Sequence, residues 1–374
     1  MIKNAVFYCL FAIALLPAAV TKTYAQEEAV KEETHEKRKE NIEGLKKELD
    51  DLKTVERKIS DRVKDASDHN YLSISFENDV IGNGRDENYT SGLRVTYFDV
   101  ETPMPPVIDD IAKVIPTFEI NPTTSTFFTF GQNLYTPSNI SVRENQVDSR
   151  PWAAWLYGSI GLATVTGNHL DELEFTAGVV GPEALGEQTQ KLIHNHVTDS
   201  PIPKGWKNQL EFEPGLIISW RRRWPVWYTQ NIADFRLRVE PDINVSLGNV
   251  YTYAGTGATI TFGPYKDRLQ DTPPRVQPAM AGTGFFDTPD HKLSWYLFAG
   301  IQGRAMARNI FLDGNTFQDS HSVDKKPFVA DANAGIAFTY DDYRLSYTAN
   351  YRSKEFDGQE DDSIFGSITL TTRF

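Results

Sequence analysis

The stretch that decides the fold is residues 234–247, which read DFRLRVEPDINVSL. Apolar and polar side chains alternate along it, with Pro241 standing on the apolar side. Successive side chains of a β-strand point to opposite faces, so this alternation predicts a strand with one apolar and one charged face. Residues 328–340, 343–351 and 364–374 repeat the pattern with many aromatic side chains.

These predicted strands are longer than the about five to six residues usual in a soluble sheet. Charged side chains also stand in the middle of their polar faces. Strands of about ten residues with one apolar face are typical of transmembrane barrels, which are lipid-facing outside and polar inside. We therefore predict an all-β, antiparallel outer-membrane barrel rather than a soluble sandwich, whose strands would be shorter.

Twelve strands can be placed along the chain. An even number puts both termini on the periplasmic side, so connections 79–91, 135–151 and 181–208 become the first three outer loops. Two inward-side connections, 101–124 and 265–291, are long and rich in proline, and fit the rule of short periplasmic turns poorly. The predicted strands lie near 71–77, 92–100, 125–134, 152–165, 170–180, 209–222, 233–247, 250–264, 292–307, 327–340, 342–353 and 363–374.

The N-terminal residues 1–25 have the features of a secretory signal peptide. Lys3 precedes an apolar run, and small residues at positions 23 and 25 precede the expected cleavage point. Cleavage there removes Cys9, the only cysteine in the sequence. The mature chain would then hold no disulfide, no cysteine metal site and no thiol nucleophile.

Residues 26–66 carry dense charges of both signs and contain neither aromatic residues nor proline. Ile42, Leu45, Leu49 and Leu52 recur at helical spacing, which predicts a short periplasmic helical or coiled-coil segment. It is either a solvated helix or a segment that self-associates or binds a periplasmic partner. The barrel is expected at 67–374.

The overall composition excludes several classes of protein. The formal net charge of −13 argues against nucleic-acid binding, which requires a basic patch. No internal run of about 20 apolar residues is present, so a helical membrane protein is excluded. The sequence has no HExxH, GxSxG or P-loop motif, and serine-hydrolase chemistry has no support from it.

Side chains capable of chemistry gather in the outer loops. Residues 183–197 could form a short helix with Glu187, Gln190 and His194 on one face, because residues three and four apart stack. His194 is the candidate general base, since imidazole titrates near neutrality. The alternative is a loop histidine without a role. His196 would point elsewhere on such a helix and is an internal control.

A second group of candidates consists of oxygen ligands. Asn78 and Asp79 stand at the end of a predicted strand, and Glu187 lies in the third loop. Amide and carboxylate oxygens suit Ca²⁺, so these three residues are candidate metal ligands. The alternative is turn chemistry, because Asn and Asp favour the starts of loops.

Several motifs occur in a distinctive order along the chain. They are SISFEND at 73–79, YTSGL at 89–93, LYTPS at 134–138, RPWAAWL at 150–156, GVVGP at 178–182, QKLIH at 190–194 and GWKNQ at 205–209. Together they resemble the outer-membrane lipid A 3′-O-deacylase family. The resemblance covers roughly residues 70–374 and leaves the segment 26–66 outside.

The resemblance implies a twelve-stranded, Ca²⁺-dependent barrel in the outer membrane of a Gram-negative bacterium. It also implies hydrolysis of the ester that holds the 3′ acyloxyacyl chain of lipid A. Asn78 and Asp79 match the family's Asn-Asp pair, Thr90 matches its loop threonine, and Gln190 and His194 match its Gln-x-x-x-His. In the implied reaction His194 takes a proton from water, Ca²⁺ stabilises the oxyanion, and Asn78, Thr90 and Gln190 orient water or support the metal.

The second loop supplies the substrate-binding candidates that the resemblance implies. Arg143 matches a basic residue that meets a lipid A phosphate, and Arg150 and Tyr135 lie nearby in the sequence. One feature departs from the family: residues 195–205 lack its functional glutamate and hold one acid, Asp199. Two alternatives remain, a non-catalytic barrel acting as a channel or scaffold, and an outer-membrane phospholipase.

Overall fold

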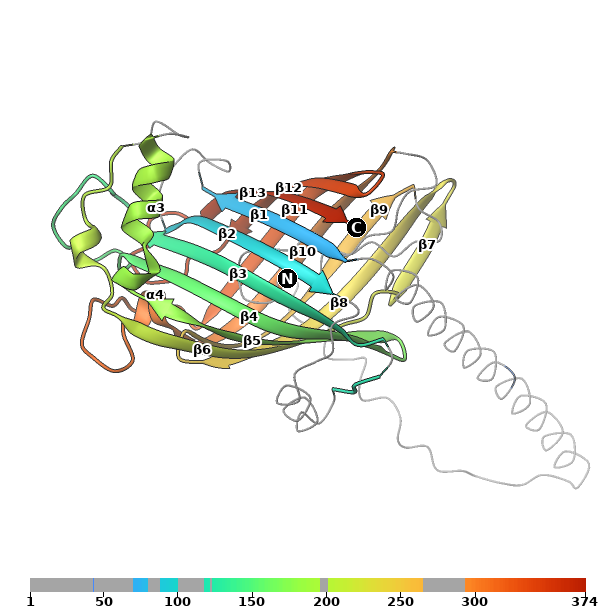
Figure 1. Cartoon of the computed structure of the whole chain (residues 1–374), viewed down its shortest axis with the longest axis horizontal. Helices are drawn as coiled ribbons and strands as arrows, with labels where there is room; N and C mark the ends of the chain where they lie inside the picture. The colour runs from blue at the N-terminus through green and yellow to red at the C-terminus, as the bar shows by residue number, and fades with distance from the viewer. Residues whose placement is uncertain are drawn as a thin grey trace, which may run out of the picture. The chain divides into compact units, whose positions relative to one another are not determined.

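The computed structural model describes residues 43, 70–79, 88–99, 118–121, 123–195, 201–264 and 293–374. The predicted signal peptide, and the predicted helical segment apart from Glu43, lie outside these residues. The described residues from Asn70 onward belong to one compact unit that contains the sheet (Figure 1). Its strands are β1 Tyr71–Asn78, β2 Asn88–Asp99, β3 Ser125–Thr136, β4 Ala153–Thr166, β5 His169–Val180, β6 Glu213–Arg223, β7 Tyr228–Ile232, β8 Phe235–Gly248, β9 Tyr251–Gly263, β10 Leu293–Asn309, β11 Phe328–Tyr340, β12 Tyr343–Arg352 and β13 Ser363–Arg373.

The strands form one antiparallel sheet in which most neighbours in sequence are also neighbours in space. The first strand pairs with the last, Tyr71 opposite Arg373, and β6 pairs with β8. These two pairings close the sheet into a barrel. The connections after β1, β3 and β5 therefore lie at one end of the barrel, as predicted for the first three outer loops.

The number of strands around the barrel is twelve, although the sheet has thirteen. Both β6 and β7 pair with β8, the first along residues 242–248 and the second along residues 235–239. They are one wall strand interrupted at 224–227, where Pro225 has no N–H to offer the ladder. The predicted count is confirmed, but the predicted strand at 209–222 begins too early and misses the second half.

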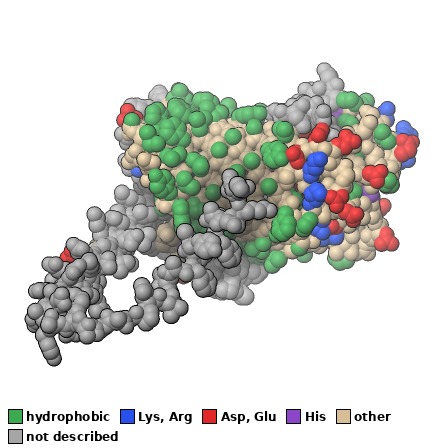
Figure 2. All heavy atoms as spheres, turned by 180° about the vertical axis from the view of Figure 1, so that it is seen from behind, with side chains coloured by type: hydrophobic (Ala, Val, Ile, Leu, Met, Phe, Trp, Pro, Cys, Tyr) green, Lys and Arg blue, Asp and Glu red, His purple; other side chains and the backbone are tan. Residues whose placement is uncertain are grey.

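Alternation along the strands separates a lipid-facing outside from a polar inside. In β8, Arg238, Glu240 and Asp242 are buried within the barrel, whereas Ile243 and Leu247 are exposed on its outer face. Figure 2 shows hydrophobic side chains covering much of the wall, with charged side chains gathered toward the end that carries the loops. No helix among the described residues is both long and apolar enough to cross a bilayer.

Ion pairs fill the middle of the barrel. Arg94 of β2 pairs with Glu174 of β5 at 3.2 Å. Arg223 reaches Glu172 at 3.3 Å and Glu240 at 3.0 Å. Charges removed from water require such partners, so these pairs join strands along the inside of the wall.

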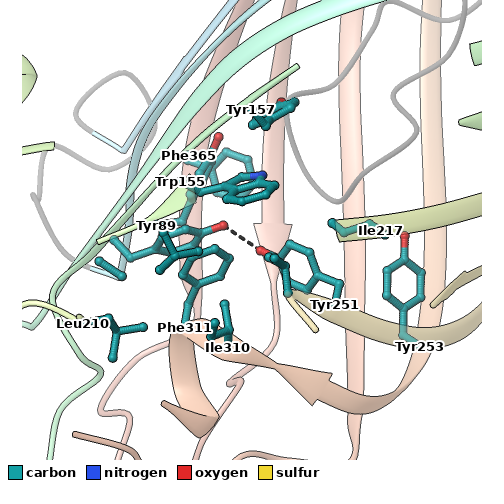
Figure 3. Packing of buried hydrophobic residues seen from close by; sticks show 14 residues of the cluster. Tyr89, Trp155, Tyr157, Leu210, Ile217, Tyr251, Tyr253, Ile310, Phe311 and Phe365 are labelled. Carbon is teal, nitrogen blue, oxygen red and sulfur yellow. Dashed lines mark hydrogen bonds between the residues drawn. The ribbon is translucent and has the colours of Figure 1, made fainter. Parts of the chain in front are cut away.

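Aromatic side chains close the barrel at the end that carries the loops. The short helix α4, Ile310–Asp313, places Phe311 against Tyr135 with ring centroids 4.0 Å apart. The hydroxyls of Tyr135 and Tyr251 share a hydrogen bond of 2.6 Å (Figure 3, dashed line). Tyr89 and Trp155 point into the same cluster (Figure 3). This plug and the ion pairs below it leave little room for a water-filled channel.

We expect the purified barrel to show no stable single-channel conductance in a planar bilayer. The reason is that packed aromatic rings and paired charges occupy the lumen, whereas conducting porins enclose water. Steady ohmic steps from the unmodified chain would contradict this expectation and favour the channel alternative.

Candidate functional site

The third outer loop folds against the outer face of the wall. It contains the 3-10 helices η1, Pro182–Ala184, and η3, Trp206–Asn208, and the helix α3, Gly186–Ile193. Leu134 and Ala154 share the outward face of their strands but are fully buried, because Ala184 and Trp206 pack over them. Phe130, four residues from Leu134 on the same face, is 58% exposed. The loop therefore covers a patch of wall that would otherwise face lipid.

Small residues allow this close approach. A Cβ added to Gly186 would come within 2.5 Å of both Ala154 Cβ and the Trp206 ring. Leu185, between η1 and α3, adopts a left-handed conformation with φ 58°, which is costly for a residue with a side chain. The backbone N–H of Gly181 donates to the carbonyl of Ala154 at 3.2 Å and pins the start of the loop to β4.

Gln190 in α3 and His194 at the C-terminal end of this helix are both buried. Each bonds to a residue further along the loop. The Nδ1 atom of His194 lies 2.7 Å from the carbonyl oxygen of Pro201. A carbonyl can only accept, so neutral His194 carries its proton on Nδ1 and its basic nitrogen is Nε2. Trp206 Nε1 donates to Gln190 Oε1 at 2.7 Å, which fixes the orientation of the Gln190 amide.

Asn78, Asp79 and Thr90 meet at the end of β1. The Asn78 amide and the Asp79 backbone N–H both donate to the carbonyl of Thr90, at 3.1 and 3.2 Å. Thr90 sits at a register shift between Tyr89 and Ser91 in the pairing of β2 with β3. Bulges of this kind re-aim side chains beside functional sites. The Thr90 hydroxyl here shares a 2.6 Å hydrogen bond with Thr136.

Both groups of residues belong to the outer side of the wall. Asn78 and the exposed Ile74 lie on the same face of β1. Thr136 shares its face of β3 with Gln132 and Leu134. Gln132 Nε2 donates to the carbonyl of Ala184 at 2.6 Å and ties β3 to η1. Figure 1 shows α3 at the end of the barrel where β1 ends and β2 begins. The two groups of candidate residues thus belong to elements that contact β3, with Thr90 on β2 bonded to Thr136 and α3 packed against β3 and β4.

The donor set at the end of β1 suits a hard cation in kind. Asn78 can present only its Oδ1 to a cation, because its Nδ2 is bonded to Thr90, and Asp79 adds a buried carboxylate. Glu187 is a different case, since it is half-exposed and accepts a 2.6 Å ion pair from Lys191 on its own helix. Among the described residues, no three His, Cys, Asp or Glu side chains converge around a metal position.

The candidate substrate-binding residues separate into two environments. Arg143 is exposed on the second loop, and its carbonyl accepts from Asn208 of the third loop at 2.8 Å. Arg150 is fully buried, pairs with Glu355 at 3.3 Å and lies over the ring of Tyr135. Tyr135 belongs to the aromatic plug. The assignment of Arg150 and Tyr135 to substrate binding stays a prediction, and Arg150 in this structure holds a carboxylate of the protein.

Sequence reasoning missed the partners that orient the candidate residues. Trp206 and the carbonyl of Pro201 bond to Gln190 and His194, and Thr136 bonds to Thr90. Trp206 and Thr136 stand within the quoted motifs, but their contacts depend on how the loop folds back on the wall. His196 and Asp199 lie outside the described residues.

Comparison with known proteins points to one family. A family model described as "Outer membrane protein LpxR" matches residues 49–374. The solved structure of LpxR from Salmonella typhimurium is 23% identical, with a TM-score of 0.66 over 81% of this chain and 99% of that chain. A KdgM porin covers the same shares of the two chains, at 5% identity and a TM-score of 0.33. No match was found among curated proteins.

Proposed function

Since the chain belongs to the LpxR family of outer membrane proteins, we propose that it is a Ca²⁺-dependent esterase that removes the 3′-linked acyloxyacyl chain of lipid A. The observation that carries the proposal is the buried pair of His194 and Gln190 on the outer face of the wall, each oriented by a second residue. A lipid of the outer leaflet can reach this face sideways, without entering the barrel. The substrate would be lipopolysaccharide.

The reaction is ester hydrolysis by water. His194 Nε2 accepts a proton from the water as its oxygen attacks the ester carbonyl carbon. The tetrahedral intermediate collapses as the ester C–O bond breaks, and the imidazolium returns the proton to the departing sugar oxygen. The products are a carboxylic acid and a free hydroxyl. In this proposal the Gln190 amide on α3 and the Thr90 hydroxyl on β2 would orient the water.

Asn78 and Asp79 would hold the Ca²⁺, with water completing its shell. When bound, the ion supplies positive charge that stabilises the developing oxyanion. Glu187 is a weaker candidate ligand than its spacing indicated, because its carboxylate is paired with Lys191. Arg143, exposed on the neighbouring loop, is the residue we propose to meet a phosphate of lipid A.

Replacing Asp79 with asparagine should raise the Ca²⁺ concentration needed for half-maximal activity by tenfold or more. The substitution keeps the shape but removes the charge that attracts a hard cation. The measurement is a Ca²⁺ titration of deacylation in detergent, with Glu187→Gln as the matched control. If Glu187→Gln shifts the titration and Asp79→Asn does not, the ligand assignment is wrong.

The proposed function is tested by expressing the chain in a Gram-negative host and recording lipid A masses with and without Ca²⁺. Loss of one acyloxyacyl group that requires Ca²⁺ would support it. An unchanged spectrum from an inserted barrel would count against lipid A, and phospholipid release in the same cells would favour a phospholipase. If neither changes, the scaffold alternative gains weight.

A further inference from the structure

The lipid-facing wall carries a groove below the covered site. It has a volume of about 790 Å³ and spans β3, β4, β5, β6 and β8. The outward-facing residues that line it are mostly apolar, and its floor is the backbone of the central strands. They include Phe128, Gly158, Ile160, Phe175, Ala177 and Leu216.

Two small residues create the hollow. Gly158 of β4 and Ala177 of β5 lie directly opposite each other in the ladder. Residues paired across neighbouring strands form a row on the wall. In this row Phe130 of β3 lies beside Gly158 and Leu216 of β6 lies beside Ala177, and both stand out from the wall, at 58% and 65% exposed. The next row inward, Ile160 opposite Phe175, closes the lower end. A wall of large side chains therefore surrounds a floor with almost none.

The groove continues directly from the candidate site. Leu156 and Val179 form the row above Gly158 and Ala177, and they pack against the cluster that seats η1 and α3. Rows on one face of a strand are two residues apart, about 7 Å along the chain. The hollow thus begins within one row of the wall that the covering loop buries.

We propose that this groove seats an acyl chain of the lipid A molecule whose ester is cut. The inference rests on the proposed function and adds to it a determinant of chain length. Inside a bilayer the surroundings are as apolar as the protein, so association depends on van der Waals packing rather than on the hydrophobic effect. A hollow between protruding side chains provides such packing, and a flat wall does not.

The sharpest test fills the hollow without disturbing the barrel. A Cβ on Gly158 would meet nothing closer than the Thr129 carbonyl at 3.7 Å, so Gly158→Leu should be accommodated while occupying the groove. Gly303 on β10 is also exposed on the outer wall, with nothing within 4 Å of an added Cβ. Gly303→Leu is therefore the matched control.

For Gly158→Leu we expect kcat/KM on lipid A with full-length chains to fall about tenfold, the scale of a single misfitting methylene in an apolar pocket. Lipid A with shortened chains should lose less than this, and Gly303→Leu should resemble the unmodified chain with both substrates. Equal activity and unchanged chain-length preference in Gly158→Leu would overturn the proposal, provided that the variant folds, as judged by heat-modifiable migration on gels.

A second measurement does not depend on catalysis. The full chain is reconstituted in vesicles containing lipid A with a photoreactive diazirine on its 3′ acyl chain, and crosslinked residues are mapped by mass spectrometry. Crosslinks concentrated on β3–β6 support the groove even if no hydrolysis occurs, in which case the proposed function alone fails. Crosslinks spread evenly around the barrel, or an equal signal from a phospholipid with the same diazirine chain, would overturn it.

Discussion

Replacing His194 with alanine is expected to lower the rate of lipid A deacylation by about 10²–10⁴-fold, the usual contribution of a general base. His194 is buried, and its Nδ1 proton is held by the carbonyl of Pro201, so that Nε2 is the basic nitrogen. Alanine removes the proton acceptor but leaves α3 able to form. The measurement is the rate of release of the acyloxyacyl group from purified lipid A in detergent.

His321 offers a matched control. It is another outer-loop histidine whose ring bonds to a backbone carbonyl, that of Val147, at 3.3 Å. His321→Ala therefore removes the same kind of hydrogen bond at a place where no catalytic role is proposed. Full activity in His194→Ala, or an equal loss in both variants, would show that His194 is not the base.

Replacing Arg94 with methionine is expected to lower the free energy of unfolding by about 3–5 kcal/mol, the usual cost of breaking a buried ion pair. Arg94 is 2% exposed and Glu174 is 1% exposed, and the two charges lie 3.2 Å apart inside the barrel. Arg94 also donates to Thr129, and Glu174 accepts from Ser159. The substitution would leave the Glu174 carboxylate buried without its cation. Urea unfolding in detergent, followed by tryptophan fluorescence, measures the loss.

Arg373 provides the comparison for this prediction. Its partner Asp342, 3.1 Å away, stands in an exposed turn at the end of the barrel. Because water screens exposed pairs, Arg373→Met should cost less than about 1 kcal/mol. The double variant Arg94→Met with Glu174→Met should recover much of the loss, since no lone charge remains buried. Equal small losses in the two single variants would mean that the interior pair contributes little to the stability of the barrel.

Most of the barrel could be predicted from local pattern. The alternation in 234–247 becomes β8, with its charges inside and its apolar side chains on the lipid side. The break between β6 and β7 was missed, because Pro225 interrupts a strand whose two halves are aligned only by their common partner β8. The pairing of β6 with β8 joins residues 19 to 31 positions apart in the sequence.

Only part of the candidate site could be predicted from the sequence. The spacing that put Glu187 beside Gln190 and His194 is correct for a helix, but the carboxylate turns to Lys191 instead. The sequence predicts that Arg150 is a cation in an outer loop. In the structure it is buried against Glu355, which lies 205 residues further along the chain. A carboxylate so distant in sequence leaves no local signal.

The sequence by itself determined the class of fold and the residues available for chemistry, because strand periodicity and side-chain type are properties of short segments. The tertiary structure alone decided that the third loop folds over the outside of the wall. It also decided which nitrogen of His194 is basic, and where a hollow lies on the lipid-facing surface. Each depends on contacts between residues that lie apart in the sequence and meet only in the folded chain: Ala184 with β3, Trp206 with Gln190, and Gly158 with Ala177.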